Sequence, residues 1–213
     1  SIFMTLFILD LYFASNIAAV GQARAGVWSL SEFMSGFAGW RKATPEPPLI
    51  LSRPEWTRAT DAFPIEITDM RLSYQVLRGS DPLDGVRVEP TDLRKALERE
   101  FRGKLLRLRQ GYGTYAPEPA ALGALGLQCA ATILVLLRGV LTIVGKRVSS
   151  DSNELAATAA DLIGFEPEHL LHVVRHRSDR EWRCGAPEFE NYMSAVEQTA
   201  GFVDQLQLGD QWC

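Results

Sequence analysis

The chain has 213 residues, of which 46% are hydrophobic and 23% charged, and its formal net charge at pH 7 is −4. This length is enough for one large domain or two small domains with hydrophobic cores. The charge balance argues against an acidic disordered tail and leaves nucleic acid binding only to a local patch, so we expect no nucleic acid partner. The three cysteines, Cys129, Cys184 and Cys213, form no CxxC pair, which argues against a zinc site or a disulfide framework and predicts a cytoplasmic location.

The first segment, residues 2–9, is an apolar run rich in β-branched and aromatic side chains, which predicts a central strand. Its roughly nine apolar residues are too few to cross a bilayer, which needs about 20. Because the run starts at the first residues of the chain, we expect that the front part of this domain is missing. Ser15 or Asn16 can cap a helix over residues 16–42, where four glycines favour two helices or one interrupted helix.

The next segments alternate between strand and helix signals. Residues 49–51 predict a short strand, and Ser52 can cap a short helix that ends near residue 60. Residues 72–79 predict another strand, which the turn sequence GSDPLDG ends. Together with the first strand, this order predicts a small α+β domain with a mixed sheet over residues 1–90.

Two carboxylates, Glu66 and Asp69, lie inside the apolar segment FPIEITDM, residues 63–70, which we also predict to be a strand. Alternate residues of a strand share a face, so the two carboxylates would point to opposite faces. A buried charge is costly unless it is paired or coordinates something. Glu66 is therefore either on the solvent face of an edge strand or part of a site, and the role of Asp69 stays open.

The second half of the chain predicts only helices. Residues 89–112 form a strongly amphipathic pattern with Thr91 as a candidate cap, and five apolar residues fall on one stripe. These are Leu93, Leu97, Phe101, Leu105 and Leu108. Further helices are predicted over residues 149–165, 166–177 and 186–208. With the apolar segment that precedes them, they predict a bundle of four or five helices over residues 91–213.

That apolar segment, residues 121–146, has the length of a transmembrane helix, but Arg138 lies at its centre. A central arginine costs ~2.5–3.5 kcal/mol on insertion into a bilayer. We therefore predict a buried bundle helix and no membrane partner. A buried Arg138 needs an acidic partner, for which Asp161, Glu197 and Asp204 are the candidates.

Two further groups of polar residues have both a structural and a functional interpretation. Lys104 and Arg107 share a face of the first bundle helix, either as a solvated surface paired with Glu98 and Glu100 or as a site for phosphate oxygens. Arg102 and Arg109 belong to the same basic cluster.

Three histidines, His169, His172 and His176, can share one helical face at a spacing that can bind metal. With no cysteine or acidic cluster nearby, a polar surface stripe is the favoured interpretation.

Several strings in the chain resemble a bacterial nucleotidyltransferase-like family of the DNA polymerase β superfamily. The strings are FPIE, VLRGSDPL, EFRGKLLRLRQ, LLRGVLTIVG and YMSAVEQTAGFVDQL, and the resemblance extends from about residue 5 onward. It implies a nucleotidyltransferase-like domain, here truncated or degenerate, followed by a helical domain of the kanamycin-nucleotidyltransferase or HEPN-like kind.

The resemblance also implies a site. In that superfamily three carboxylates on adjacent strands hold two Mg²⁺ ions, which align the attacking oxygen with the nucleotide phosphate. Glu66 matches the third carboxylate and is the implied catalytic and metal-binding residue. Ile2 and Met4 stand where the first two acids would fall. Lys104 and Arg107 are the implied contacts to a nucleoside triphosphate.

Two functions follow from these expectations. The first is Mg²⁺-dependent transfer of a nucleotidyl group to an acceptor. The alternative is a catalytically inactive nucleotide-binding or protein-interaction module with a protein partner.

Overall fold

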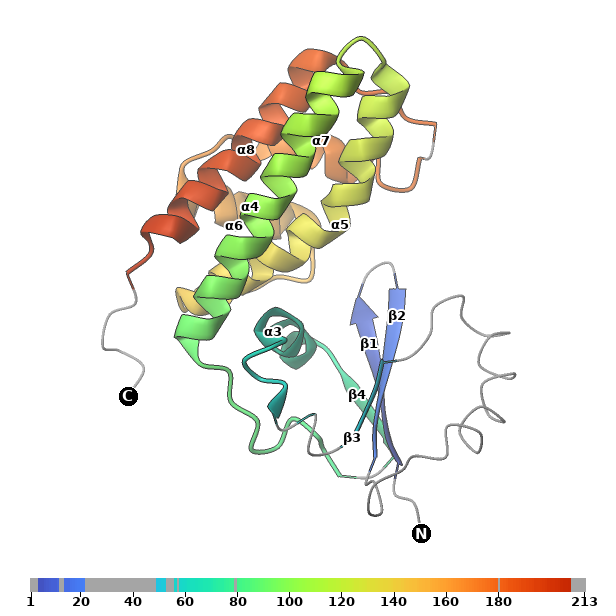
Figure 1. Ribbon diagram of the computed structural model, residues 1–213, viewed down its shortest axis with the longest axis vertical. Helices are drawn as coiled ribbons and strands as arrows, with labels where there is room; N and C mark the ends of the chain where they lie inside the picture. The colour runs from blue at the N-terminus through green and yellow to red at the C-terminus, as the bar shows by residue number, and fades with distance from the viewer. Residues whose placement is uncertain are drawn as a thin grey trace. The chain divides into compact units, whose positions relative to one another are not determined.

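The computed structural model describes residues 4–11, 14–21, 49–52, 56, 58–78, 80–179 and 181–207. The chain divides into two compact units, Ser1–Glu89 and Pro90–Cys213. Figure 1 shows strands and one labelled helix in the first unit and the remaining helices in the second.

The first unit contains a four-stranded sheet in the order β3-β2-β1-β4. Its strands are β1 (Met4–Leu11), β2 (Ala14–Gly21), β3 (Leu49–Ser52) and β4 (Gln75–Arg78). β1 pairs antiparallel with both β2 and β4, whereas β2 pairs parallel with β3. Four strands with these pairings do not by themselves identify a nucleotidyltransferase-like domain, which stays a prediction.

The strands predicted over residues 2–9, 49–51 and 72–79 are present, but the helix predicted from residue 16 is wrong in its first part. Residues 14–21 form β2, in which Ile17 pairs with Ile8 and Ala14 with Leu11. Partner strands on both sides satisfy the backbone groups of β2 and override the local helix signal. The remainder of the predicted helix, residues 22–42, and residues 53–55 of the predicted short helix lie outside the described residues.

The strand predicted over residues 63–70 is also wrong, because this segment forms helix α3 (Pro64–Leu72). Pro64 occupies the first turn, where a proline needs no backbone partner, and Glu66 in the same turn suits the positive end of the helix dipole. The hydroxyl of Thr68 donates to the Pro64 carbonyl at 2.7 Å. The helical period replaces the strand alternation, so that Glu66 is exposed while Asp69 is only 7% exposed.

A small apolar cluster forms the core that the structure describes in the first unit. It joins Ile67 and Met70 of α3 with Trp56 and Leu83. The Trp56 indole N–H donates to the Pro82 carbonyl at 2.7 Å, which ties this cluster to the segment after β4.

The described part of the second unit is a bundle of five helices, as predicted (Figure 1). They are α4 (Pro90–Tyr115), α5 (Pro119–Ile143), α6 (Ser152–Ile163), α7 (Pro167–Arg175) and α8 (Ala186–Gln205). α4 packs most extensively against α5 and α8. Its predicted apolar stripe is buried throughout, from Leu93 to Leu108.

The start of α4 differs from the prediction by one residue. The helix begins at Pro90, so Thr91 lies inside the first turn and is not the cap. The fixed φ of proline suits the first helical position, which explains why the helix extends to Pro90.

Helix α5 is long and apolar enough to cross a membrane by length and composition, and 56% of its most apolar window is buried within the chain's own fold. Its buried residues include Leu122, Cys129, Ile133 and Val140. The predicted core helix is therefore present. This burial does not assign a compartment, and the cytoplasmic location stays an expectation.

Candidate functional site

Glu66, the predicted catalytic and metal-binding residue, lies exposed in the first turn of helix α3 and not on a strand. Among the described residues, no group of three or more His, Cys, Asp or Glu side chains could hold a metal ion. Mg²⁺ prefers a near-octahedral set of oxygen ligands, and a single exposed carboxylate provides only a small part of it. The described residues thus do not form the implied Mg²⁺ site, and the role of Glu66 rests on the resemblance alone.

Asp69 is buried on the core side of α3 and interacts with another group of the protein. A carboxylate in this position is expected to be engaged, because an unpaired buried charge is costly. Asp69 is therefore best explained as a structural residue of α3.

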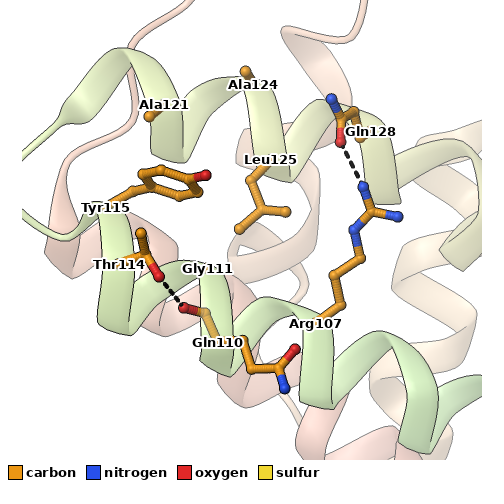
Figure 2. Close-up of a pocket in the computed structure, with 9 residues that line it drawn as sticks. All are labelled: Arg107, Gln110, Gly111, Thr114, Tyr115, Ala121, Ala124, Leu125 and Gln128. Atoms are coloured by element: carbon orange, nitrogen blue, oxygen red, sulfur yellow. Dashed lines mark hydrogen bonds between the residues drawn. The ribbon is translucent and has the colours of Figure 1, made fainter.

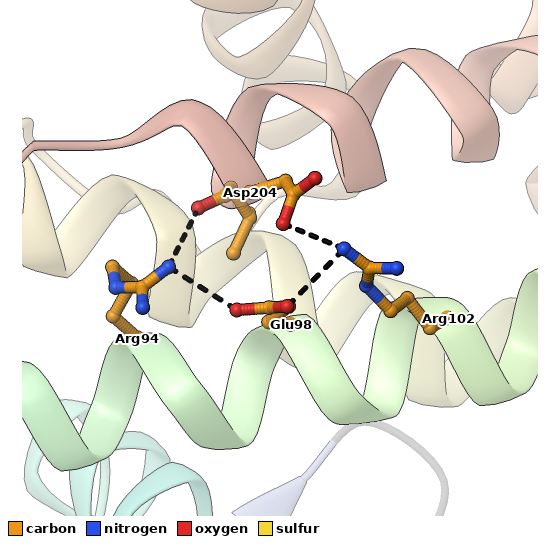
Figure 3. Close-up of polar contacts among 5 residues, drawn as sticks. Arg94, Glu98, Arg102 and Asp204 are labelled. Carbon is orange, nitrogen blue, oxygen red and sulfur yellow. Dashed lines mark hydrogen bonds and ion pairs between the residues drawn. The ribbon is translucent and has the colours of Figure 1, made fainter.

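The basic cluster of α4 divides into two parts. Arg102 binds Asp204 of α8 at 2.6 Å and Glu98 at 3.2 Å, and Arg109 binds Glu197 of α8 at 2.5 Å. Figure 3 shows the first of these groups, in which Glu98 lies between Arg94 and Arg102. Of the predicted pairs with Glu98 and Glu100, the structure thus shows the one between Arg102 and Glu98, whereas Arg109 pairs with a residue of α8 that the sequence did not indicate.

Arg107 belongs to the other part, because it faces α5. Its guanidinium donates to the Gln128 side-chain oxygen of α5 at 2.8 Å. Lys104 lies one turn earlier and is half-buried. The positive charges of Lys104 and Arg107 both act to lower the pKa of Cys129 on α5, although burial has the larger effect and raises it. Of the two predicted phosphate contacts, Arg107 therefore lies at the seam between α4 and α5, and Lys104 lies one turn earlier on α4.

A cavity of about 470 Å³ opens at this seam. It is lined by Arg107, Gln110, Gly111, Thr114 and Tyr115 of α4 and by Ala121, Ala124, Leu125 and Gln128 of α5. We call it the α4–α5 pocket. In Figure 2, Arg107 and Gln128 meet at one end, Tyr115 lies at the other, and Leu125 lies between them.

Local packing at Gly111 explains why the two helices approach closely at this pocket. A Cβ atom at Gly111 would lie 2.0 Å from the Cδ2 atom of Leu125. Only glycine leaves this space to the Leu125 side chain. At the end of α4, the Glu118 N–H donates to the Tyr115 carbonyl at 2.7 Å, so the chain turns directly into α5.

Two of the three histidines do not fit the predicted surface stripe. His172 and His176 are half-buried and pack against Trp182, whose ring is stacked on His176 with a centroid distance of 4.8 Å. His176 lies just after α7, and its Nδ1 is 2.8 Å from the His172 carbonyl oxygen. Aromatic packing on Trp182 accounts for these two side chains, and within the described residues no metal-binding group includes them.

Arg138 is half-buried in α5 and interacts with other groups of the protein. Two of its candidate partners, Glu197 and Asp204, form ion pairs with Arg109 and Arg102, respectively.

Sequence reasoning identified Arg107 but missed the residues that surround it. Gln128 was visible as a polar residue within an apolar helix, but its contact with Arg107 joins positions 21 residues apart. Tyr115 carried no signal, because it follows the predicted end of the amphipathic pattern. Glu66 belongs to the first unit and the pocket to the second, so the predicted site that combines them stays a prediction.

Comparisons with family models, with curated proteins and with solved structures gave no match for this chain.

Proposed function

We propose that the chain is a nucleotide-binding module of nucleotidyltransferase-like ancestry, and that the α4–α5 pocket holds the nucleotide. The observation that carries this proposal is the position of Arg107, a predicted phosphate contact that lines an open cavity. The sequence resemblance supports the ancestry.

The chemistry of the pocket suits a nucleotide. A guanidinium is planar and has five N–H donors, so Arg107 can bind Gln128 and a phosphate oxygen at the same time. Tyr115 provides an aromatic face, and base–aromatic stacking contributes ~1–3 kcal/mol per base in other proteins. The volume of about 470 Å³ lies within the usual range for small-molecule sites, ~300–1,000 Å³.

Nucleotidyl transfer with Mg²⁺ is the second candidate. It is favoured by the match of Glu66 to a metal-binding carboxylate and by the exposure of that side chain in the structure. Residues outside those described would have to supply the other metal ligands. If metal binds at Glu66, it would activate the nucleotide phosphate towards an acceptor.

Isothermal titration with ATP, with and without Mg²⁺, tests the proposed binding. We expect saturable binding that does not require Mg²⁺ and that Arg107→Ala weakens by at least tenfold. Arg99→Ala is the matched control, because Arg99 is an exposed arginine on the same helix that pairs only weakly with Glu100 at 3.6 Å. Absence of binding by ATP and by every other adenine nucleotide, or an equal loss in both variants, would contradict the proposal.

A pyrophosphate-release assay separates the two candidates. A binding module releases no pyrophosphate from ATP and Mg²⁺ at any acceptor concentration. Release that Glu66→Gln abolishes, and that Arg99→Ala preserves, would instead support the transferase.

We also propose that the module acts in the cytoplasm with a protein partner and without a membrane or nucleic acid partner. Co-purification from a lysate of the source cells, followed by gel filtration of the isolated complex, tests the protein partner. Purification without detergent tests the proposed lack of a membrane partner.

A further inference from the structure

We infer that the α4–α5 pocket selects a nucleotide with a single negative charge, the charge state of a phosphodiester such as a cyclic nucleotide. The inference rests on the proposed nucleotide-binding function and specifies the class of ligand.

The charge of the pocket is the first argument. Arg107 is the charged residue among those described that line it, and none of the described lining residues is acidic. One guanidinium balances one negative charge, and Lys104, one turn earlier on α4, is not among the lining residues, so an additional charge on the ligand would gain no paired cation in the pocket. A phosphate monoester carries about −1.5 to −2 charges at pH 7, and a triphosphate carries more.

Gln128 supplies a second group for the same anion. Its side-chain oxygen accepts the hydrogen bond from Arg107, which orients the amide so that its NH₂ group is the part left to donate. The two donors come from different helices, α4 and α5. A phosphodiester offers two non-bridging oxygens, which is the number that this pair of donors can bind.

The opposite end of the pocket suits a ring. Tyr115 is 39% exposed, and Ala121 lies beside its ring in Figure 2. Arg107 and Tyr115 are eight residues apart on α4 (115 − 107), which corresponds to about 12 Å along the helix axis. Leu125 lies between the two ends, so the middle of the pocket favours the apolar edge of a sugar over another charge.

The charges along the chain favour one orientation of the ligand. Glu118 is exposed and follows Tyr115 closely, with its N–H bound to the Tyr115 carbonyl. Glu118 adds a negative charge just beyond the end of α4, whereas Arg107 supplies a positive charge at the other end of the pocket, so an anion is favoured at the Arg107 end. The ring is therefore placed at Tyr115 and the single anion at Arg107.

A ligand series with one base and increasing charge tests this inference. Titrations of the full chain, without metal, use adenosine, 3′,5′-cyclic AMP, AMP and ATP at low ionic strength. We expect cyclic AMP to bind at least tenfold more tightly than adenosine, and AMP and ATP to bind more weakly than cyclic AMP. Arg107→Gln should remove the preference for cyclic AMP over adenosine, whereas Tyr115→Ala should weaken both ligands by a similar factor of five or more.

Arg99→Gln controls for the loss of one positive charge on α4 and should leave the order of affinities among the four ligands unchanged. Arg107 and Tyr115 are exposed side chains, so far-UV circular dichroism is expected to be the same in all variants. Binding of AMP or ATP at least as tight as that of cyclic AMP would overturn the inference while the proposed nucleotide-binding function remains. Absence of binding by every ligand would overturn both.

Discussion

Gly123 of α5 lies so close to Trp182 that a Cβ atom on the glycine would be 2.3 Å from the Trp182 carbonyl oxygen. The same segment is tied to α5 by the Cys184 N–H, which donates to the Pro119 carbonyl at 2.9 Å. The connection between α7 and α8 is therefore packed directly on the first turns of α5. A backbone group cannot move aside as a flexible side chain can, so this contact requires glycine.

Substitution of this glycine is expected to destabilise the bundle. Gly123→Ala should lower the free energy of unfolding by about 1–3 kcal/mol, the usual cost of an overpacked contact. Gly103→Ala on α4 is the control, because a Cβ atom there would meet no described atom within 4 Å. This control should raise the free energy of unfolding by roughly 0.5–1 kcal/mol, since alanine favours the helix over glycine. Urea titration measures both, and a neutral Gly123→Ala would contradict the close packing.

Two leucines of α4 provide a test of the buried stripe. Leu108 is fully buried, whereas Leu106 is 57% exposed. Leu108→Ala should lower the free energy of unfolding by about 2–5 kcal/mol, because it leaves a cavity in the core. Leu106→Ala should change it by less than about 0.5 kcal/mol. Equal effects in urea titrations would mean that the face of α4 has been assigned incorrectly.

The cysteines of the bundle are expected to be unreactive while the protein is folded. Burial raises the pKa of the Cys184 thiol to about 11, with a smaller contribution from Glu188, and burial also raises the pKa of Cys129. The thiolate is the reactive form, so alkylation at pH 8 should be slow. In a Cys213→Ser background, mass spectrometry after iodoacetamide treatment should find modification only once urea unfolds the chain. Rapid labelling without urea would contradict this expectation.

The same shift predicts a dependence of stability on pH. The folded pKa of Cys184 is above the ordinary value of about 8.5, so the folded protein retains this proton after the unfolded chain has lost it. The associated stability is fully present below about pH 8.5 and is lost as the pH rises towards about 11. Cys184→Ala should show a smaller fall in Tm between pH 8 and pH 10.5. An unchanged pH profile in this variant would exclude Cys184 as a cause.

Asp151 is the N-cap of α6, where its carboxylate accepts hydrogen bonds from the backbone N–H groups of Glu154 and Asn153. These hydrogen bonds lower the pKa of Asp151, and the bond from the Glu154 N–H has the largest effect. The depressed pKa gives stability that is present above about pH 4 and is lost as the pH falls through the folded pKa. Asp151→Ala should lower Tm clearly at pH 7 and less at pH 3. Asp151→Asn keeps a hydrogen-bond acceptor, so its Tm at pH 7 should lie between those of the wild type and Asp151→Ala. If Asp151→Ala lowered Tm equally at pH 7 and pH 3, the electrostatic contribution would be contradicted.

The predictability of the fold differed between the two units. On α4 the apolar residues from Leu93 to Leu108 recur at helical spacing, and a helix needs only its own backbone to form its hydrogen bonds. Residues 14–21 and 63–70 had mixed local signals. Pairing with β1 and β3 made the first a strand, and Pro64 together with burial of Ile67 and Met70 made the second a helix.

The candidate site, like the fold, was predictable only where the signal was local in the sequence. The sequence showed that Arg107 was a cation on an amphipathic helix, but it could not show which of the neighbouring cations would be paired. Arg102 and Arg109 bind carboxylates of α8 that lie 102 and 88 residues away in the chain. Arg107 instead binds Gln128 of α5. Such pairings depend on how helices pack, and a helix presents different residues to each neighbour.

By itself, the sequence determined the helices of the second unit, their apolar faces and the burial of α5, because hydrophobic periodicity is a local property of the chain. Only the tertiary structure decided that FPIEITDM is a helix, that Glu66 stands exposed while Asp69 is buried, and that Arg107, Gln128 and Tyr115 line one pocket. These outcomes depend on contacts between residues that are distant in sequence, and such contacts form only when the elements pack together.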